Sequence, residues 1–295
     1  MIKKLLIIAA MTSAFAVQAQ ETINVAWGFS MGSTSANSVR VICDELNKAQ
    51  NKYTFVLASK PGAGGTIAAN AVTASPENTL VAMSSSFIIR PYFERTEPTH
   101  NLDNFTPVMV QGNGSPLTIT SSKHASMAEA YANPKLTIGV SGVGSISHLV
   151  ANEIINVNKT AAIVNFKNNV DAGTAAAGGH VDVAVTFDSD TAAFVEANKL
   201  TLLGRTGPGT QLREIPDAAK LAANYAIYAS TAMDPVRFKE IHQMMVSINT
   251  KPAVINSYKR DQVNPVVLSL EQSRTWYTNE RVFWKKQVDK ISRTK

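Results

Sequence analysis

LTIGVSGVGSISHLVANEII, residues 136–155, is the stretch that decides the fold. Apolar residues alternate over 136–140, which predicts a β-strand. Glycine and serine then dominate residues 141–147, so the chain turns here with little side-chain bulk. Apolar residues recur at helical spacing over 146–154 and predict the buried face of a helix. A strand, a tight turn and a helix in this order indicate an α/β fold.

The turn at 141–147 is also a candidate binding site for an anion. Backbone N–H groups at the start of a helix lack partners within the helix, and the helix dipole is positive there. A small carboxylate would suit such donors, and serine hydroxyls would add more. The candidate donors in this turn are Ser141, Gly142, Gly144 and Ser145. An ordinary strand-to-helix turn capped by Ser145 would explain the same pattern.

The same order of elements occurs near the start of the chain. Residues 23–29 predict a strand, the hydroxyl-rich stretch SMGSTSANS at 30–38 a turn, and residues 36–46 a helix. The candidate donors here are Ser30, Ser33, Thr34 and Ser35. Two such turns, facing each other from two domains, could hold one ligand between them. Ser84 ends a further predicted strand, where ligand groups collect in α/β folds.

Strands and helices alternate over most of the remaining chain, which predicts an α/β sandwich with mostly parallel sheets. Further strands are expected over residues 53–59, 80–84, 117–121, 163–166, 181–187, 201–204 and 226–229. Further helices are expected over residues 67–73, 125–131, 168–177, 235–248 and 270–291. The last helix carries four aromatic residues that we expect to pack on the first domain, namely Trp276, Tyr277, Phe283 and Trp284.

The N-terminus has the pattern of an export signal. Lys3 and Lys4 precede an apolar run over residues 5–17, and the small-residue segment Ala16–Ala19 follows. The run is shorter than a membrane span requires. We therefore expect cleavage near Ala19 and export of the mature protein to a bacterial periplasm, with residues 1–19 removed.

Composition limits the classes of function. The chain has 295 residues and a formal net charge of +6, but its charges are scattered and form no basic run. This pattern argues against nucleic acid as a partner. The single cysteine, Cys43, excludes an intramolecular disulfide, and its helical spacing with apolar neighbours favours a buried hydrophobic role over a reactive thiol.

The sequence offers little support for catalysis, a metal or a cofactor. Residues 139–143 resemble a nucleophile elbow, but Val143 stands where that motif needs glycine. Residues 60–66 are glycine-rich but lack the Gly-Lys-Ser/Thr ending of a phosphate loop. The five histidines are isolated and lack metal-ligand spacing. We therefore expect neither catalytic residues nor metal ligands nor a bound cofactor.

One segment carries a family resemblance. SKPGAGGTIAANAVTASPENTL, residues 59–80, resembles the signature of the Bug-type solute receptors of tripartite tricarboxylate transporters. Companion segments keep the family's order along the mature chain. They are FSMGSTSANSVR (29–40), IGVSGVGSISHLVANEI (138–154), VNFKNNVDAGTAAAGGHVDVAVTFD (164–188), REIPDAAKLA (213–222) and the Glu280…Trp284 spacing.

The resemblance implies a two-domain fold like that of periplasmic binding proteins, with a ligand cleft between two α/β domains. Domain 1 would be discontinuous, with residues 20–116 and 226–295, and domain 2 would comprise residues 117–225. The resemblance implies capture of a small organic carboxylate by the turns at 30–36 and 141–147, and delivery to the membrane permease. Ser84, Phe166 and Asp188 would line the rest of the cleft.

Some points stay open at this stage. The family usually has aspartate in the first turn where this chain has Ala36, so the identity of the carboxylate does not carry over. We expect a monomeric receptor. A receptor of the same fold that signals to a membrane kinase is one alternative. A secreted serine hydrolase that uses Ser141 is another.

Overall fold

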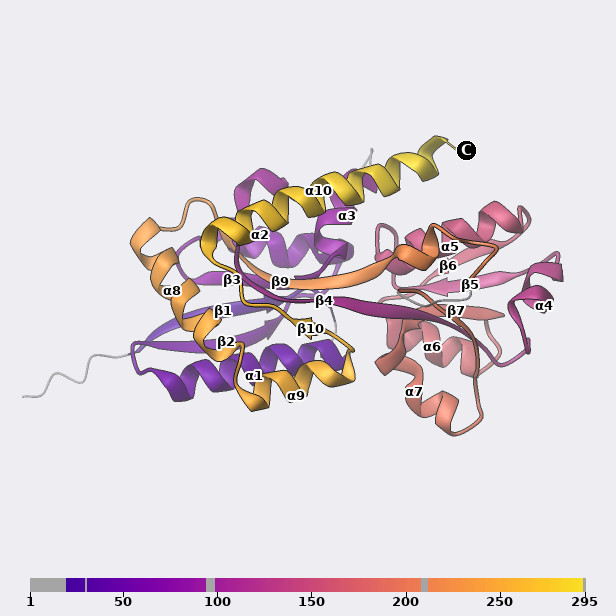
Figure 1. Cartoon of the computed structure of the whole chain (residues 1–295), viewed down its shortest axis with the longest axis horizontal. Helices are drawn as coiled ribbons and strands as arrows, with labels where there is room; N and C mark the ends of the chain where they lie inside the picture. Colours follow the sequence, from indigo (N-terminus) through magenta and orange to yellow (C-terminus); the bar gives the residue numbers. More distant parts are fainter. Residues whose placement is uncertain (1–19, 30, 94–98, 208–211, 294–295) are drawn as a thin grey trace, which may run out of the picture.

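The computed structural model describes residues 20–29, 31–93, 99–207 and 212–293. Figure 1 shows two lobes joined by two long strands, β4 (Phe105–Ser121) and β9 (Ala222–Ser230), that run side by side from one lobe to the other. The family resemblance implied such a two-domain arrangement. Among the described residues, no helix combines the length and the apolar character needed to cross a bilayer.

The first lobe is built on strands in the order β2-β1-β3-β9-β4. Strand β1 (Glu21–Trp27) runs parallel to both β2 (Tyr53–Ser59) and β3 (Thr79–Ser84). Its helices are α1 (Thr34–Ala49), α2 (Thr66–Ala74), α3 (Ser86–Phe93), α8 (Pro235–Ile248), α9 (Pro252–Arg260) and α10 (Leu270–Arg293). Short 3₁₀ turns lie at Ala63–Gly65 and Leu102–Asn104.

The second lobe continues the sheet in the order β4-β7-β5-β6. Strand β5 (Thr137–Val140) runs parallel to β6 (Ala162–Asn165) and β7 (Val183–Phe187). Strand β8 (Thr201–Arg205) pairs with β4, as does the short β10 (Asn264–Pro265) of the first lobe. Its helices are α4 (Met127–Ala132), α5 (Ile146–Val157), α6 (Asn169–Ala177) and α7 (Asp188–Glu196), and Ala218–Lys220 forms a 3₁₀ turn.

The two connecting strands are longer than the sequence predicted. Residues 117–121 and 226–229 were expected to be strands, whereas β4 and β9 extend well beyond both. Their pairing is antiparallel and shifts register near Gly112, as at a β-bulge. The expectation of mostly parallel sheets therefore holds for β1–β3 and β5–β7 but not for the strands between them. The expected domain boundaries fall inside β4 and β9, so the exact division stays a prediction.

Local sequence explains the helices that flank the predicted turns. Ser33 caps α1, since its hydroxyl accepts a hydrogen bond from the Ala36 N–H at 3.3 Å. Ser145 caps α5 in the same way, with the His148 N–H as donor at 3.1 Å. Cys43 is buried in the core as expected, and burial raises the pKa of its thiol to about 12.

Helix α10 packs on the first lobe through some of its aromatic residues. The Tyr277 hydroxyl donates to the Leu102 carbonyl at 3.0 Å, and Trp284 is fully buried. Phe283 instead remains 37% exposed, because it lies next to Trp284 on the outer side of the helix. The expected packing of α10 is therefore confirmed for Tyr277 and Trp284. It is also confirmed for Trp276, which packs on the core and donates to the Asn113 side chain at 3.3 Å.

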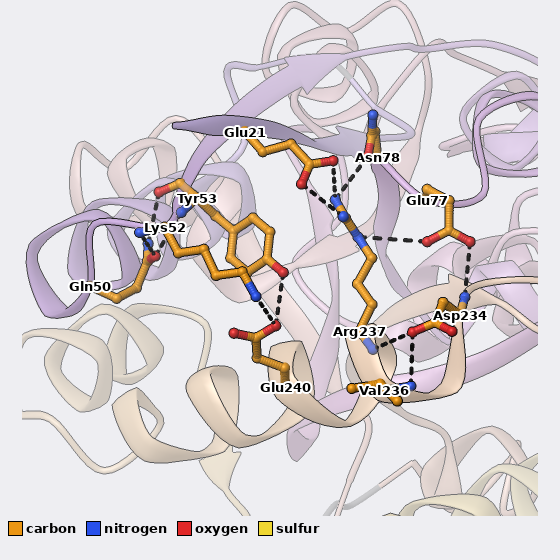
Figure 2. A network of polar contacts seen from close by, with 10 residues as sticks. All are labelled: Glu21, Gln50, Lys52, Tyr53, Glu77, Asn78, Asp234, Val236, Arg237 and Glu240. Atoms are coloured by element: carbon orange, nitrogen blue, oxygen red, sulfur yellow. Dashed lines mark hydrogen bonds and ion pairs between the residues drawn. The ribbon is translucent and has the colours of Figure 1, made fainter. Parts of the chain in front are cut away.

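A polar network holds α8 against the sheet at the start of β1 and β2 (Figure 2). Arg237 bonds to the Glu21 carboxylate and the Asn78 side chain at 2.8 Å each, and its guanidinium lies over the Tyr53 ring. The Tyr53 hydroxyl in turn donates to Glu240 at 2.9 Å. These groups lie at the ends of β1 and β2 opposite to those that reach the candidate site, so their role is structural.

Candidate functional site

A cavity lies between the lobes, where β1, β3, β5 and β7 end. The first lobe contributes Trp27, Phe29, Ser33, Ser35, Ser84, Ser86 and Tyr225 to its wall. The second lobe contributes Ser141, Ile146, Asn168, Asn169, Phe187 and Asp190. Both turns that the sequence singled out therefore reach one cavity, from opposite sides.

Several helices begin at the wall of this cavity. Helices α1, α3, α5, α6 and α7 each place a residue of the N-cap or first turn there. Helix N-termini carry partial positive charge and attract anions. Among the described residues, no lysine, arginine or histidine lines the cavity. An anion would therefore be held by helix ends and hydroxyl groups rather than by a cationic side chain.

The serine hydroxyls of the wall retain protons for a ligand. The Ser33 oxygen accepts from its own helix, and the Ser86 oxygen accepts from the Ile146 N–H at 3.3 Å. Each hydroxyl can still donate its proton, because a serine oxygen accepts and donates independently. Ser35 differs, since its hydroxyl donates to the Tyr225 oxygen at 3.2 Å and so leaves the Tyr225 proton to donate elsewhere.

The turn at 141–145 is held by its own hydrogen bonds. The Gly144 N–H donates to His148 Nδ1 at 3.1 Å, and the Ser145 hydroxyl donates to the Gly142 carbonyl at 2.8 Å. Gly142 and Gly144 have φ angles of +94° and +75°, which side chains other than glycine rarely adopt. Only Ser141 of this turn lines the cavity itself, with its hydroxyl 3.0 Å from the Ser147 hydroxyl.

The remaining predicted residues are placed as follows. Gly142 and Phe166 line a neighbouring open groove of about 1110 Å³, which shares Phe29 and Ser141 with the cavity. Gly144 and Ser145 line neither space and shape the turn instead. Thr34 begins α1, and its side chain is not described. Ser30 lies outside the described residues.

Asp188 does not line the cavity. Its carboxylate accepts a hydrogen bond from Arg205 at 2.7 Å and another from the Gln262 amide. Asp190, two residues further on, is the carboxylate at the wall. Burial raises the pKa of Asp190 to about 7, and the negative charge of Asp261 adds to this effect.

Several wall residues were missed by the sequence reasoning. Trp27, Phe29 and Phe187 were read as parts of strands, and Asn168 and Asn169 as the start of a helix. Tyr225 had no sequence signal, because its partner Ser35 lies 190 residues away. The aromatic and asparagine residues had one signal in the sequence that could have found them. Each lies near the end of a predicted strand or just after it, where ligand groups collect in α/β folds.

Direct contacts join the lobes around the cavity. From α3, Arg90 donates to the Val143 carbonyl and Ser86 accepts from Ile146. On the other side, the Ser189 hydroxyl of α7 donates to Asp261 at 2.9 Å. Both lobes therefore touch each other at the rim of the cavity and complete its wall.

Comparison with known proteins identifies the family. The family model TctC, described as the receptor of the tripartite tricarboxylate transporter family, matches residues 38–292. The chain belongs to this receptor family. Membership confirms the resemblance that the segment at 59–80 and its companions indicated. Receptors of this family bind small carboxylates and work with membrane transporter subunits. No curated protein sequence matches the chain.

Solved structures of periplasmic receptors share the fold. R. palustris Rpa4515 with adipate has a TM-score of 0.79 at 19% identity, over 94% of this chain and 98% of that one. MatC from Rhodopseudomonas palustris with bound malate has a TM-score of 0.78 at 18% identity, over 91% of this chain and 99% of that one. The periplasmic binding protein BugD has a TM-score of 0.79 at 16% identity, over 92% of this chain and 98% of that one.

Proposed function

We propose that this family member captures a small organic carboxylate between its lobes and delivers it to the permease of a tripartite transporter. The observation that supports this most strongly is the closed cavity at which helix N-termini and serine hydroxyls converge from both lobes. A single helix end contributes about 0.3–1 kcal/mol to anion binding, whereas micromolar affinity needs about 8 kcal/mol. Donors from both lobes are therefore needed on one ligand.

We further propose that the ligand stabilises the closed arrangement and that β4 and β9 connect the moving lobes. The domains would be residues 20–116 with 226–295, and residues 117–225. Ligand binding favours a closed state only if contacts differ between the open and closed states. A ligand in the cavity would touch wall residues of both lobes, such as Ser33 and Ser141, only when the lobes are closed, so its contacts would differ in this way. One chain supplies both walls of the cavity, which supports a monomeric receptor.

We propose that the mature protein works in the periplasm after cleavage near Ala19, and that it is not an enzyme. Strand β1 begins at Glu21, after the expected cleavage point, so cleavage there would remove none of the helices and strands described above. The Ser141 hydroxyl is paired with the Ser147 hydroxyl, which is too weak a base to activate a nucleophile. A serine-reactive phosphonate should therefore leave the protein unlabelled, and labelling of Ser141 would favour the hydrolase alternative.

A thermal-shift screen tests the proposed function. Residues 20–295 would be unfolded and refolded to remove any carried ligand, then heated with mono-, di- and tricarboxylates, amino acids and neutral amide analogues. A ligand at one hundred times its Kd adds about 2.7 kcal/mol to the free energy of unfolding. We expect a rise in Tm with at least one carboxylate and none with its neutral amide. A shift with neutral compounds alone would contradict the proposal.

A further inference from the structure

Asp190 is the acidic side chain of the cavity wall, and this position is unusual for a site that takes an anion. It is the third residue of α7, and Asp188 is the first. Asp188 is neutralised by Arg205 in an ion pair of 2.7 Å. Asp190 instead faces two neutral donors, the Asn169 side chain and the Phe187 backbone, which offset only part of the rise that burial causes in its pKa.

The charges around Asp190 do not compensate it. Asp261, the C-cap residue of α9 on the other lobe, raises the pKa of Asp190 further because both groups are acidic. Tyr225, which faces the same cavity from β9, is neutral because burial raises the pKa of its hydroxyl. In the part of the chain that the structure describes, the cavity wall holds no cation, and no group of acidic and histidine side chains could hold a metal ion. When Asp190 is ionised, its full negative charge exceeds the roughly half positive charge at the start of α7, so this end of the cavity is electronegative.

Asn169 provides a second acceptor beside Asp190. Its amide nitrogen faces the Asp190 carboxylate, because the amide oxygen would be repelled by that carboxylate. The Asn169 oxygen is then buried and, within the described residues, has no hydrogen-bond partner. A buried acceptor without a donor is costly, so a ligand that donates to it gains affinity.

Resting on the proposed function, we infer that Asp190 and Asn169 select a carboxylate that also carries a protonated amine, and that they disfavour dicarboxylates. The carboxylate would face the helix ends and hydroxyls, while the ammonium group would donate to Asp190 and to the Asn169 oxygen. An ammonium has three donors and no acceptor, which matches these two oxygens. A second ligand carboxylate at this end would instead meet like charge.

Binding of four probes tests this inference by calorimetry at about pH 8, where Asp190 is largely ionised before ligand binds. The probes are butyrate, succinate, 4-aminobutyrate and 2-aminobutyrate. We expect at least one of the two amino acids to bind at least about tenfold more tightly than succinate, which corresponds to one charge-assisted hydrogen bond. Tighter binding of succinate than of both amino acids would overturn the inference.

Variants then assign the preference to Asp190. Asp190→Asn keeps an acceptor for the Phe187 N–H but lacks the charge, so the preference for amine over succinate should fall at least about tenfold. Asp188→Asn is the matched control on the same helical turn, and it should leave the ratio of the two affinities unchanged. An unchanged ratio in Asp190→Asn, or an equal change in Asp188→Asn, would contradict the assignment.

Two further outcomes separate this inference from the proposed function. If Asp190→Asn does not fold, Asn169→Ala provides the second variant, and it should weaken binding of the amino acids more than of succinate. If the wild type binds carboxylates without preference for an amine, only the inference fails. If the wild type binds no carboxylate in the screen or here, the proposed function fails and the inference with it.

Discussion

Gly144→Ala should weaken ligand binding because the added methyl group meets the opposite lobe. A Cβ at Gly144 would lie 2.8 Å from Arg90 Cδ and 3.2 Å from Arg90 Cα. The arginine side chain can move, but its backbone can yield only if α3 shifts. Such overpacking costs about 1–3 kcal/mol. Because the contact forms only when the lobes are closed, the cost falls on closure and therefore on affinity.

The matched control is Gly142→Ala. Both glycines have positive φ, so each alanine variant carries a backbone strain of about 1–2 kcal/mol. A Cβ at Gly142, however, meets nothing nearer than the Phe166 carbonyl oxygen at 3.7 Å. Both variants should thus unfold at similarly lowered temperatures. Only Gly144→Ala should bind ligand more weakly than the control does. The overpacking cost of about 1–3 kcal/mol corresponds to an increase in Kd of about 5- to 150-fold.

The assay combines calorimetry with small-angle scattering. The Kd would be measured for the carboxylate with the largest thermal shift, and the radius of gyration would be measured with and without it. We expect compaction on binding in the wild type and in Gly142→Ala, but less in Gly144→Ala at equal ligand concentration. A folded Gly144→Ala protein with the Kd of Gly142→Ala would show that the Arg90–Gly144 contact is absent from the bound state.

Three further predictions concern pH, packing and the thiol. The pKa of Asp190 is about 7 in the folded protein, against an ordinary value of 3.8. The contribution of Asp190 to the free energy of unfolding is therefore full below about pH 3.8 and is lost as the pH rises through 7. Asp190→Asn should therefore raise the free energy of unfolding at about pH 8 by at most about 4 kcal/mol, and raise Tm with it. It should also flatten the decline of Tm between about pH 4 and 7, and an unchanged profile of Tm against pH would argue against the raised pKa. Ser86→Ala should leave the Ile146 N–H without its acceptor and lower ligand affinity, because removing one partner of a buried hydrogen bond costs about 1–3 kcal/mol. Calorimetry would compare the Kd of the variant with that of the wild type. Equal Kd values would mean that water replaces the hydroxyl. Cys43 should react with a thiol reagent only on unfolding, because its thiol is buried with a pKa near 12; rapid labelling of the native protein would refute its burial.

Much of the fold was predictable because its signals are local. The strand and helix around residues 141–147 follow from apolar periodicity and from turn chemistry between near neighbours. Helix α3 was not predicted. Its residues are apolar on nearly all sides, so no apolar face stands out, and the helix contains Pro91 and ends at Phe93. Long antiparallel pairing between β4 and β9 was also missed, because cross-strand partners lie more than one hundred residues apart and leave no local pattern.

The sequence by itself determined that two hydroxyl-rich turns precede helices, and that acidic residues stand at positions 188 and 190. The structure places both on α7, a helix that the sequence did not predict. Because residues two apart on a helix differ in direction by about 200°, the two carboxylates face opposite sides of it. Only the tertiary structure decided which side is the cavity. Arg205 on β8 and Gln262 beyond α9 engage Asp188, and Asp190 is left to face the ligand site. Such choices depend on packing between segments distant in sequence, which local periodicity does not encode.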